Sequence, residues 1–206
     1  TVRLALLPAL TNCRIIEAYV GRPDLRWPLP KKLANRLEGR IFGAPYRRGK
    51  FLLLPLNEQE TMLLHLGMSG TIHIIAKKKK NLFTNSSFYN SPSLPKKHNH
   101  IEIIFDDIKV VYNDPRRFGF FQIINNSHFL NKRLAHFGPE PFQSQFNLNY
   151  ISSFLKKKKK NIKNFLLDQS FVSGIGNIYA SEILFFCKIN PNKKAYLINK
   201  KDLKKI

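Results

Sequence analysis

The chain has 206 residues, with 35 Lys and Arg against 13 Asp and Glu, so its formal net charge is +22 and nucleic acid is the leading candidate partner. Hydrophobic residues make up 43% and aromatic residues 12%, which excludes a disordered basic tail and suits one large domain or two smaller ones. No apolar run approaches the ~20 residues that cross a bilayer and no signal-peptide layout is present, so a soluble intracellular protein without a membrane partner is expected.

The first part of the chain is predicted to be mainly β-structure. Residues 1–10 and 29–40 are predicted helices, the first kinked at Pro8. Between residues 50 and 124, short runs rich in β-branched and aromatic residues then follow one another: FLLLPL, TMLLHLGM, TIHIIA, HIEIIFDD, KVVYND and FGFFQII. Several alternate apolar and polar residues, as strands with one buried face do. Residues 1–124 are therefore expected to form a β-sandwich or barrel.

From about residue 131 the apolar residues recur at helical spacing. The predicted helices cover residues 131–138, 147–169, 177–189 and 199–206, and Gly138, Pro139 and Pro141 mark the first boundary. Residues 125–206 are therefore expected to form a helical domain, which makes the fold class α+β.

Two runs of lysine need separate interpretations. The run at 77–80 leads into a polar stretch, so a solvated loop is favoured over a binding element. The run at 156–160 lies inside the helical pattern 147–169. There, a face turned towards phosphates and a plain solvated face remain equal alternatives.

The stretch DQSFVSGIGNIYASE, residues 168–182, places Gly174 and Gly176 in a tight connection between two helices. Asn177 is predicted to be the N-cap of the second helix. Glycines allow a DNA backbone to approach the first amides of that helix, whose positive end suits a phosphate. An ordinary interhelical turn with a glycine C-cap is the alternative.

Two further stretches suggest exposed apolar side chains. In NDPRRFGFF, Asp114 and Pro115 predict a turn with Arg116 and Phe118 at its tip, and an exposed Phe beside arginines suits a wedge between bases. An enzyme that works on a base must extrude it and fill the gap. In HLGMSG, Met68 could project outward in the same way, although composition alone favours a core methionine.

The cysteines and histidines predict no metal site. Cys13 and Cys187 are far apart, so buried free thiols are expected rather than a disulfide or a zinc ligand set. His98 and His100 flank an asparagine without further ligands, and surface histidines are the simpler interpretation. Lys50 by itself is an ordinary lysine at the start of a strand.

Six motifs occur in one order along the chain: RRGKFLLL, LLHLGMSG, KKHNH, NDPRRFG, HFGPEP and FVSGIGNIYASE. From Thr1 to about Pro191 the chain resembles the formamidopyrimidine-DNA glycosylases. The resemblance implies a two-layer β-sandwich followed by an all-helical domain with a helix–two-turn–helix motif. It also implies base-excision repair of oxidised purines (formamidopyrimidine and 8-oxoguanine) with strand cleavage at the abasic site. The expected partner is damaged double-stranded DNA, bound by a monomer at the nucleoid in the bacterial cytoplasm.

The same resemblance implies roles for individual residues. Lys50 matches a lysine beside a phosphate that donates a proton in the lyase step. Met68, Arg116 and Phe118 match the residues that fill the gap left by the flipped base, with the arginine bonded to the widowed cytosine. The implied contacts to DNA are made by His65, His98, Lys158 and Asn177.

Two features of the family are missing from the sequence. The family begins with a proline nucleophile followed by a glutamate, and it ends in a four-cysteine zinc finger preceded by a loop over the flipped base. The chain is therefore expected to be an inactive fragment without a cofactor of its own, and the full-length protein to hold one structural zinc. An endonuclease VIII-type enzyme for oxidised pyrimidines and a non-catalytic DNA-binding protein remain alternatives, whereas Thr1 as a nucleophile lacks a paired base.

Overall fold

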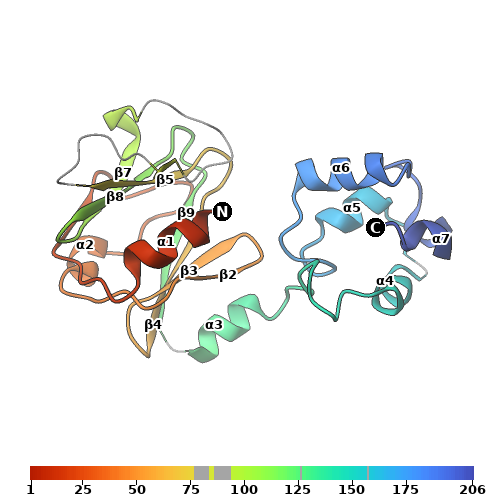
Figure 1. Ribbon diagram of the computed structural model, residues 1–206, viewed down its shortest axis with the longest axis horizontal. Coiled ribbons are helices and arrows are strands. Elements are labelled where there is room, and N and C mark those ends of the chain that lie inside the picture. The colour runs from red at the N-terminus through yellow and green to blue at the C-terminus, as the bar shows by residue number, and fades with distance from the viewer. Residues whose placement is uncertain (77–83, 86–93, 126, 157) are drawn as a thin grey trace. The chain divides into compact units, whose positions relative to one another are not determined.

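The chain folds into two compact units, Thr1–Asn131 and Lys132–Ile206. The computed structural model describes residues 1–76, 84–85, 94–125, 127–156 and 158–206, and Figure 1 shows the elements of each unit. Each unit is built around its own cluster of buried apolar side chains. The two cores can therefore be understood separately.

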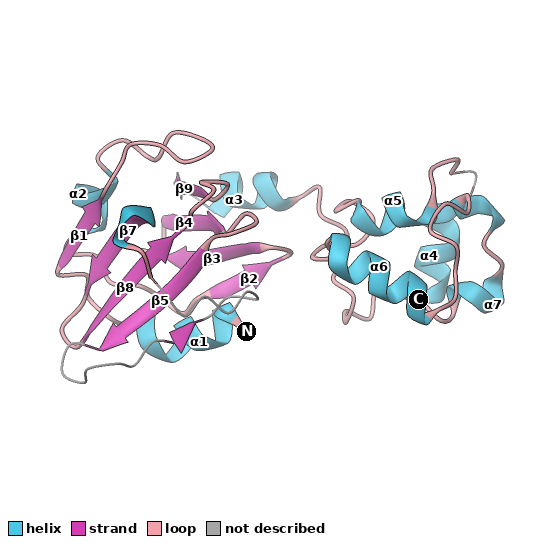
Figure 2. Cartoon of the chain, turned by 90° about the horizontal axis from the view of Figure 1, so that it is seen from above, coloured by secondary structure: helices cyan, strands magenta, loops and turns pink. Residues whose placement is uncertain are grey.

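The first unit contains two antiparallel sheets (Figure 2). One has the strand order β1-β7-β8-β5-β6 and the other the order β2-β3-β4-β9. The strands are β1 Glu17–Val20, β2 Tyr46–Arg48, β3 Phe51–Pro55, β4 Glu60–His65, β5 Thr71–Ala76, β6 Thr84–Asn85, β7 Asn99–Ile104, β8 Ile108–Asn113 and β9 Phe120–Asn125. Each of the six runs predicted as strands contains one, and β1, β2 and β6 are additional.

The core of the first unit is formed by side chains that point to the same face of each strand. Every second residue joins one buried cluster, as Met62 and Leu64 do on β4 and Phe121 and Ile123 on β9. Strands of both sheets contribute to this cluster, so it lies between two layers, and the helix α1 (Val2–Leu10) adds Leu6 and Leu10. The fold is α+β with a two-layer sandwich, which confirms the predicted class.

The second predicted helix is shorter than expected. Only α2, Leu33–Leu37, is helical within residues 29–40. Pro30 precedes it, Lys32 at its N-cap has a positive φ of 54°, and Gly39 beyond its end has a φ of 74°. These backbone conformations break helical geometry on both sides.

The second unit is helical. Its elements are α4 Leu148–Leu155, α5 Ile162–Leu167, α6 Asn177–Phe186, the 3₁₀ turn η2 Ala195–Leu197 and α7 Lys200–Leu203, while α3 Ser127–Leu134 crosses the boundary between the units. Phe171 is fully buried at the centre and contacts the rings of Phe146, Tyr150, Phe154 and Phe165. The aromatic residues therefore hold together the helices and the connection that follows α5.

The prediction of one helix over residues 147–169 is wrong. The helix α4 ends at Leu155, the C-cap Lys156 has a ψ of 127°, and α5 starts only after Asn161. Consecutive lysines repel one another and supply no apolar residue for the core, so the helix stops where they begin. The lysine run therefore belongs to a connection. The other run, residues 77–80, lies outside the described residues.

Two smaller expectations can be compared with the structure. Both cysteines are free, but only Cys187 is buried, and Cys13 is partly exposed. Within the described ranges, no helix has the length and apolar character needed to cross a membrane.

Candidate nucleic-acid interface

Two exposed loops at one end of the sandwich carry the candidate wedge residues. Residues 66–70 connect β4 to β5, and residues 114–119 connect β8 to β9, so each loop passes from one sheet to the other. The Met68 side chain is 59% exposed and the Phe118 side chain 38%. The interpretation of Met68 as a core residue is therefore wrong, because its neighbours on the strand already fill the core and the loop carries it outward.

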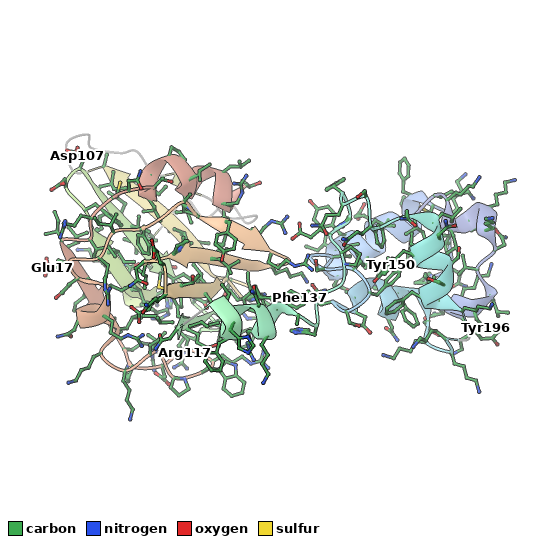
Figure 3. The ribbon with its side chains drawn as sticks, turned by 90° about the horizontal axis from the view of Figure 1, so that it is seen from below. Glu17, Asp107, Arg117, Phe137, Tyr150 and Tyr196 are labelled. Atoms are coloured by element: carbon green, nitrogen blue, oxygen red, sulfur yellow. The ribbon has the colours of Figure 1, made fainter. Side chains whose placement is uncertain are left out.

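The tip of the second loop combines charge with an aromatic ring. The Arg116 guanidinium carbon lies 4.7 Å from the centroid of the Phe118 ring, so the two side chains form a cation–π pair. Between them, Arg117, labelled in Figure 3, has a positive φ of 58°. Residues 115–118 are exposed, whereas the flanking Asp114 and Gly119 are buried.

The two loops touch through their backbones. Gly67 has a φ of 67°, and a Cβ atom there would lie 2.5 Å from the carbonyl oxygen of Phe118. Only glycine allows both this conformation and this approach. Ser69 donates a hydrogen bond across the loops to the Asp114 carboxylate, Oγ to Oδ1 2.5 Å. Met68 is thereby held next to the Arg116–Phe118 tip.

Lys50 and His65 meet at the same end of the first unit. Lys50 precedes β3, whose first residue, Phe51, pairs with His65 of β4, with ring centroids 5.0 Å apart. Partial burial lowers the pKa of Lys50. Burial lowers the pKa of His65, and the positive charge of Lys50 lowers it further. His65 Nδ1 accepts a hydrogen bond from the Gly67 N–H at 3.0 Å, so the neutral ring keeps its proton on Nε2, where it can be donated to a phosphate.

The structure separates the two histidines of KKHNH. His98 is partly exposed at the end of the 3₁₀ turn η1, Lys96–His98, and its side chain can reach a partner. His100 is only 4% exposed, and its Nε2 lies 2.8 Å from the backbone oxygen of Asp114. The interpretation as a pair of surface histidines is therefore wrong for His100, which lies at the register shift between Asn99 and Ile101 of β7 and has its ring centroid 6.3 Å from that of Tyr112.

In the second unit, Asn177 is the first residue of α6, and Gly176 is the N-cap. The predicted N-cap is thus wrong by one residue: Gly176 has extended backbone with a φ of −114° and offers no capping side chain. The first hydrogen bond of α6 runs from the Ala180 N–H to the Gly176 oxygen at 2.8 Å. The amides of the first turn therefore point out of the helix end, the arrangement that binds phosphate groups, and the Asn177 side chain is exposed beside them.

The turn before α6 is held by a residue that the motifs did not indicate. The Gln169 side chain accepts from the Gly174 N–H at 2.9 Å and donates to the Ile175 oxygen at 2.9 Å. The hydroxyl of Tyr150, labelled in Figure 3, donates to the Phe171 oxygen at 2.7 Å. In the sequence Gln169 stands between Asp168 and Ser170, and no pattern there marks it as a residue that holds a turn.

Lys158 is exposed in the connection between α4 and α5, and its ammonium nitrogen lies 5.7 Å from the centroid of the Phe154 ring. Lys160 instead lies 3.8 Å from the Asp168 carboxylate. Neighbouring lysines of one run therefore differ in their contacts. The ammonium group of Lys158 lies on a short, non-helical segment, where it can contact a phosphate.

Comparison with known families accounts for almost the whole chain. Residues 1–121 match the formamidopyrimidine-DNA glycosylase N-terminal domain, and residues 137–206 match the formamidopyrimidine-DNA glycosylase H2TH domain. The chain belongs to the formamidopyrimidine-DNA glycosylase family. The predicted family is thereby confirmed, and the roles of individual residues stay predictions.

Individual glycosylases of this family support the same assignment. The formamidopyrimidine-DNA glycosylase of Dinoroseobacter shibae is 43% identical over 197 residues, which are 95% of this chain and 68% of that protein. The enzyme of Roseobacter denitrificans is 39% identical over the same shares of both chains. This chain therefore spans about two thirds of the length of these relatives.

Solved structures give the same fold. The complex of Lactococcus lactis Fpg with DNA containing an abasic site is 28% identical, has a TM-score of 0.84, and covers 100% of this chain and 71% of its own. A complex of the same enzyme with DNA containing Fapy-dG has a TM-score of 0.83 and covers 99% of this chain and 72% of its own. The sandwich and the helical unit are thus both those of a formamidopyrimidine-DNA glycosylase.

Proposed function

We propose that the protein removes oxidised purines from double-stranded DNA in base-excision repair and cuts the strand at the resulting abasic site. Its membership of the formamidopyrimidine-DNA glycosylase family supports this function. The observation that carries it to this chain is the pairing of Met68 with Arg116 and Phe118 on two exposed loops that touch each other. Exposed apolar side chains backed by a cation are suited to entering DNA rather than to stabilising the sandwich.

The three side chains would replace an extruded nucleotide. Met68 and Phe118 are apolar and can stack against the bases next to the gap, which offsets the cost of unstacking. Arg116 can donate hydrogen bonds to the unpaired base on the opposite strand, and an arginine contact of this kind is worth ~1–3 kcal/mol of discrimination. The opposite base would therefore be read by Arg116.

The phosphate backbone would be held by both units. In the first unit Lys50, His65 and His98 supply donors around the two loops, and in the second unit Lys158, Asn177 and the first amides of α6 do so. Such contacts set the position of the protein on DNA without reading its sequence. They also make binding depend on salt, because each phosphate contact releases a counterion.

Lys50 would take part in the chemistry. Its lowered pKa makes the ammonium a better acid near neutral pH than an ordinary lysine. The neighbouring His65, whose pKa is also lowered, can hold the same phosphate through Nε2 without adding a second positive charge. Lys50 would then donate a proton when the strand is cut.

The test is borohydride trapping with the protein encoded by the complete gene. Borohydride reduces the imine between an amine of the enzyme and C1′ of the damaged nucleotide to a stable adduct. A duplex with 8-oxoguanine opposite cytosine should give base release, a nicked strand and a trapped adduct, and the undamaged duplex should give none. A duplex with an oxidised pyrimidine tests the endonuclease VIII alternative. Binding without adduct or nick on the 8-oxoguanine duplex would overturn the proposed activity.

The zinc implied by the resemblance does not fit this chain by itself. Its two cysteines, Cys13 and Cys187, lie in different units. The part of the chain described structurally contains no group of three or more His, Cys, Asp or Glu side chains placed to hold a metal. A four-cysteine site therefore cannot form from these residues, and one zinc in the full-length protein stays a prediction that metal analysis can check.

We further propose that the protein acts as a monomer at the nucleoid. Damaged DNA is the partner that its family and its basic surface support, and chromosomal DNA is the source of such lesions. Light scattering on the free protein and on its complex with one lesion-bearing duplex would test the stoichiometry. A dimer in either sample would overturn this part.

A further inference from the structure

Asp114 is a buried acidic residue in a strongly basic chain, and no described cation pairs with its side chain. The residue is 0% exposed. Within the described ranges its carboxylate accepts from four donors: Ser69 Oγ at 2.5 Å, the Tyr112 hydroxyl at 2.8 Å, the Gly119 N–H at 2.8 Å and the Arg116 N–H at 3.3 Å. A buried carboxylate is costly unless its acceptor sites are filled in this way.

The donors come from both exposed loops. Ser69 directly follows Met68, and Arg116 and Gly119 lie on either side of the Phe118 tip. One carboxylate therefore fixes the backbone next to each candidate wedge residue. The remaining donor, the Tyr112 hydroxyl, stays protonated because burial and the charge of Asp114 both raise the pKa of Tyr112.

The backbone of Asp114 reaches a third segment. Its N–H donates to the His98 oxygen at 3.0 Å, and its own oxygen lies 2.8 Å from His100 Nε2. The segment that presents His98 is thus attached to the same residue. The surrounding glycines permit this close packing: a Cβ atom on Gly119 would lie 1.7 Å from the Tyr112 hydroxyl, and one on Gly70 would lie 2.2 Å from the Leu66 oxygen.

We propose that Asp114 is a positioning residue that holds Met68, Arg116 and Phe118 in one fixed arrangement, so that they enter the DNA gap as a unit. The inference rests on the proposed function, since it assigns a cause to the geometry of the wedge. Its consequence is that affinity for a gapped duplex and discrimination of the opposite base both depend on a residue that touches no DNA.

The chemistry of Asp114→Asn makes it the sharper variant. An amide keeps one acceptor oxygen but introduces an NH₂ group, which cannot accept from a backbone N–H. The oxygen is expected to stay with Tyr112 and Gly119, because the Ser69 hydroxyl can rotate to accept from the new NH₂ group. The Arg116 N–H then loses its carboxylate acceptor and keeps only the Ser69 Oγ at 3.3 Å, so the tip of the loop is held less firmly.

Ser69→Ala is the milder variant and carries the test if Asp114→Asn fails to fold. It removes both contacts of the Ser69 hydroxyl between the loops, to the Asp114 carboxylate and from the Arg116 N–H at 3.3 Å, and leaves the carboxylate with its other donors. Asn57→Ala is the matched control, because Asn57 Oδ1 likewise fixes a turn of this unit by accepting from the Gln59 and Glu60 N–H groups at 2.8 and 2.6 Å. That turn lies at the other end of β4 from Met68.

The experiment measures binding of the protein encoded by the complete gene to three duplexes that otherwise share one sequence: one intact, one with a tetrahydrofuran abasic analogue opposite cytosine, and one with the analogue opposite adenine. Asp114→Asn should reduce the preference for the abasic duplex about tenfold and Ser69→Ala about threefold, in line with interaction energies between residues that act as a unit. Both variants should reduce the difference in affinity between the abasic duplex with cytosine and the one with adenine opposite the analogue. Affinity for the intact duplex should stay within about twofold, since phosphate contacts supply it.

A double-mutant cycle separates positioning from simple stabilisation. In the wild-type background, the effects of Met68→Ala and Phe118→Ala on the abasic preference should be non-additive, and in the Ser69→Ala background they should become additive. Unchanged non-additivity, or an equal loss of preference in Asn57→Ala, would overturn the inference. If the wild-type protein shows no abasic preference, or Met68→Ala and Phe118→Ala leave it intact, the proposed wedge itself fails and the inference falls with it.

Discussion

Gln169→Glu should detach the turn that leads into α6 without changing the shape of the side chain. The Gln169 NH₂ group donates to the Ile175 oxygen at 2.9 Å and to the Leu167 oxygen at 3.1 Å, while its oxygen accepts from the Gly174 N–H. The substitution keeps the acceptor and replaces the donor by a second acceptor. Two backbone oxygens then face a carboxylate oxygen, and the turn must open to separate them.

The expected cost follows from these contacts. Two neutral hydrogen bonds contribute ~0.5–1.5 kcal/mol each, so the free energy of unfolding of the helical unit should fall by about 1–3 kcal/mol. A loss of 1 kcal/mol lowers the Tm of a small domain by about 4–8 °C. Because Gly174 and Ile175 directly precede the first turn of α6, affinity for duplex DNA should fall together with stability.

Gln143→Glu is the matched control. Gln143 lies in the same unit, is exposed, and only accepts, from the Glu140 N–H at 2.9 Å, so the same substitution adds the same charge and keeps the hydrogen bond. Thermal unfolding and fluorescence anisotropy with duplex DNA should show a larger loss for Gln169→Glu than for Gln143→Glu. Equal losses in the two variants would refute the role of Gln169, because the added charge alone would then explain both.

The pH dependence gives an independent check on the Gln169→Glu variant. The neighbouring carbonyl oxygens raise the pKa of the introduced carboxyl group, and its protonated form can donate again. Since the folded state then binds the proton more tightly than the unfolded state, the variant should regain stability relative to wild type as the pH falls from about 8 to about 5. A defect that grows over this range would contradict the proposed geometry.

Three further predictions follow from the other contacts. Lys158→Ala should lower the slope of log affinity for duplex DNA against log salt concentration by about 0.9, the value for one phosphate contact, and an unchanged slope in an anisotropy series would remove Lys158 from the interface. Lys50→Met should raise the pKa of His65 in an NMR titration. The substitution removes the positive charge that is, next to burial, the second cause of the lowered pKa. A lower titration midpoint in the variant would contradict this contact. In the wild-type protein the pKa of His65 lies below its unfolded value of about 6.5, so the contribution of His65 to stability is present above pH 6.5 and is lost as the pH falls from there through the lower pKa of the folded state. Gly119→Ala should lower the free energy of unfolding of the first unit by at least ~1–3 kcal/mol in urea denaturation, because its Cβ would lie 1.7 Å from the Tyr112 hydroxyl, and a variant as stable as wild type would show that the loop can shift.

Much of the candidate site could be predicted from short motifs. Asp114 and Pro115 indicated a turn with Arg116 and Phe118 at its tip, and the structure exposes that tip. Composition favours a core position for Met68, whereas the structure exposes its side chain. The loop that carries Met68 outward is fixed by the close contact of Gly67 with the Phe118 backbone. That contact joins residues far apart in the chain.

Elements whose patterns are local can be predicted from the order of the amino acids alone. Strand alternation between residues 50 and 124 and the change to helical spacing near residue 131 depend only on which residues stand within a few positions of one another, and the net charge of +22 depends on composition alone. The prediction of one helix through residues 156–160 shows where local patterns fail. There the apolar spacing on both sides suggests one element, whereas the backbone of Lys156, with a ψ of 127°, ends α4, and α5 starts only after Asn161.

How these elements combine depends on contacts between residues that lie far apart in the chain. The successive strands β4 and β5 enter different sheets, and Ser69 meets Asp114 although 45 positions separate them. The role of Gln169 is likewise visible only in the folded turn, where its side-chain amide bonds to the backbone of Gly174 and Ile175. Such contacts arise because many segments must bury their apolar faces at once, so the partner of each polar group is set by the packing of the whole unit and not by its neighbours in the chain.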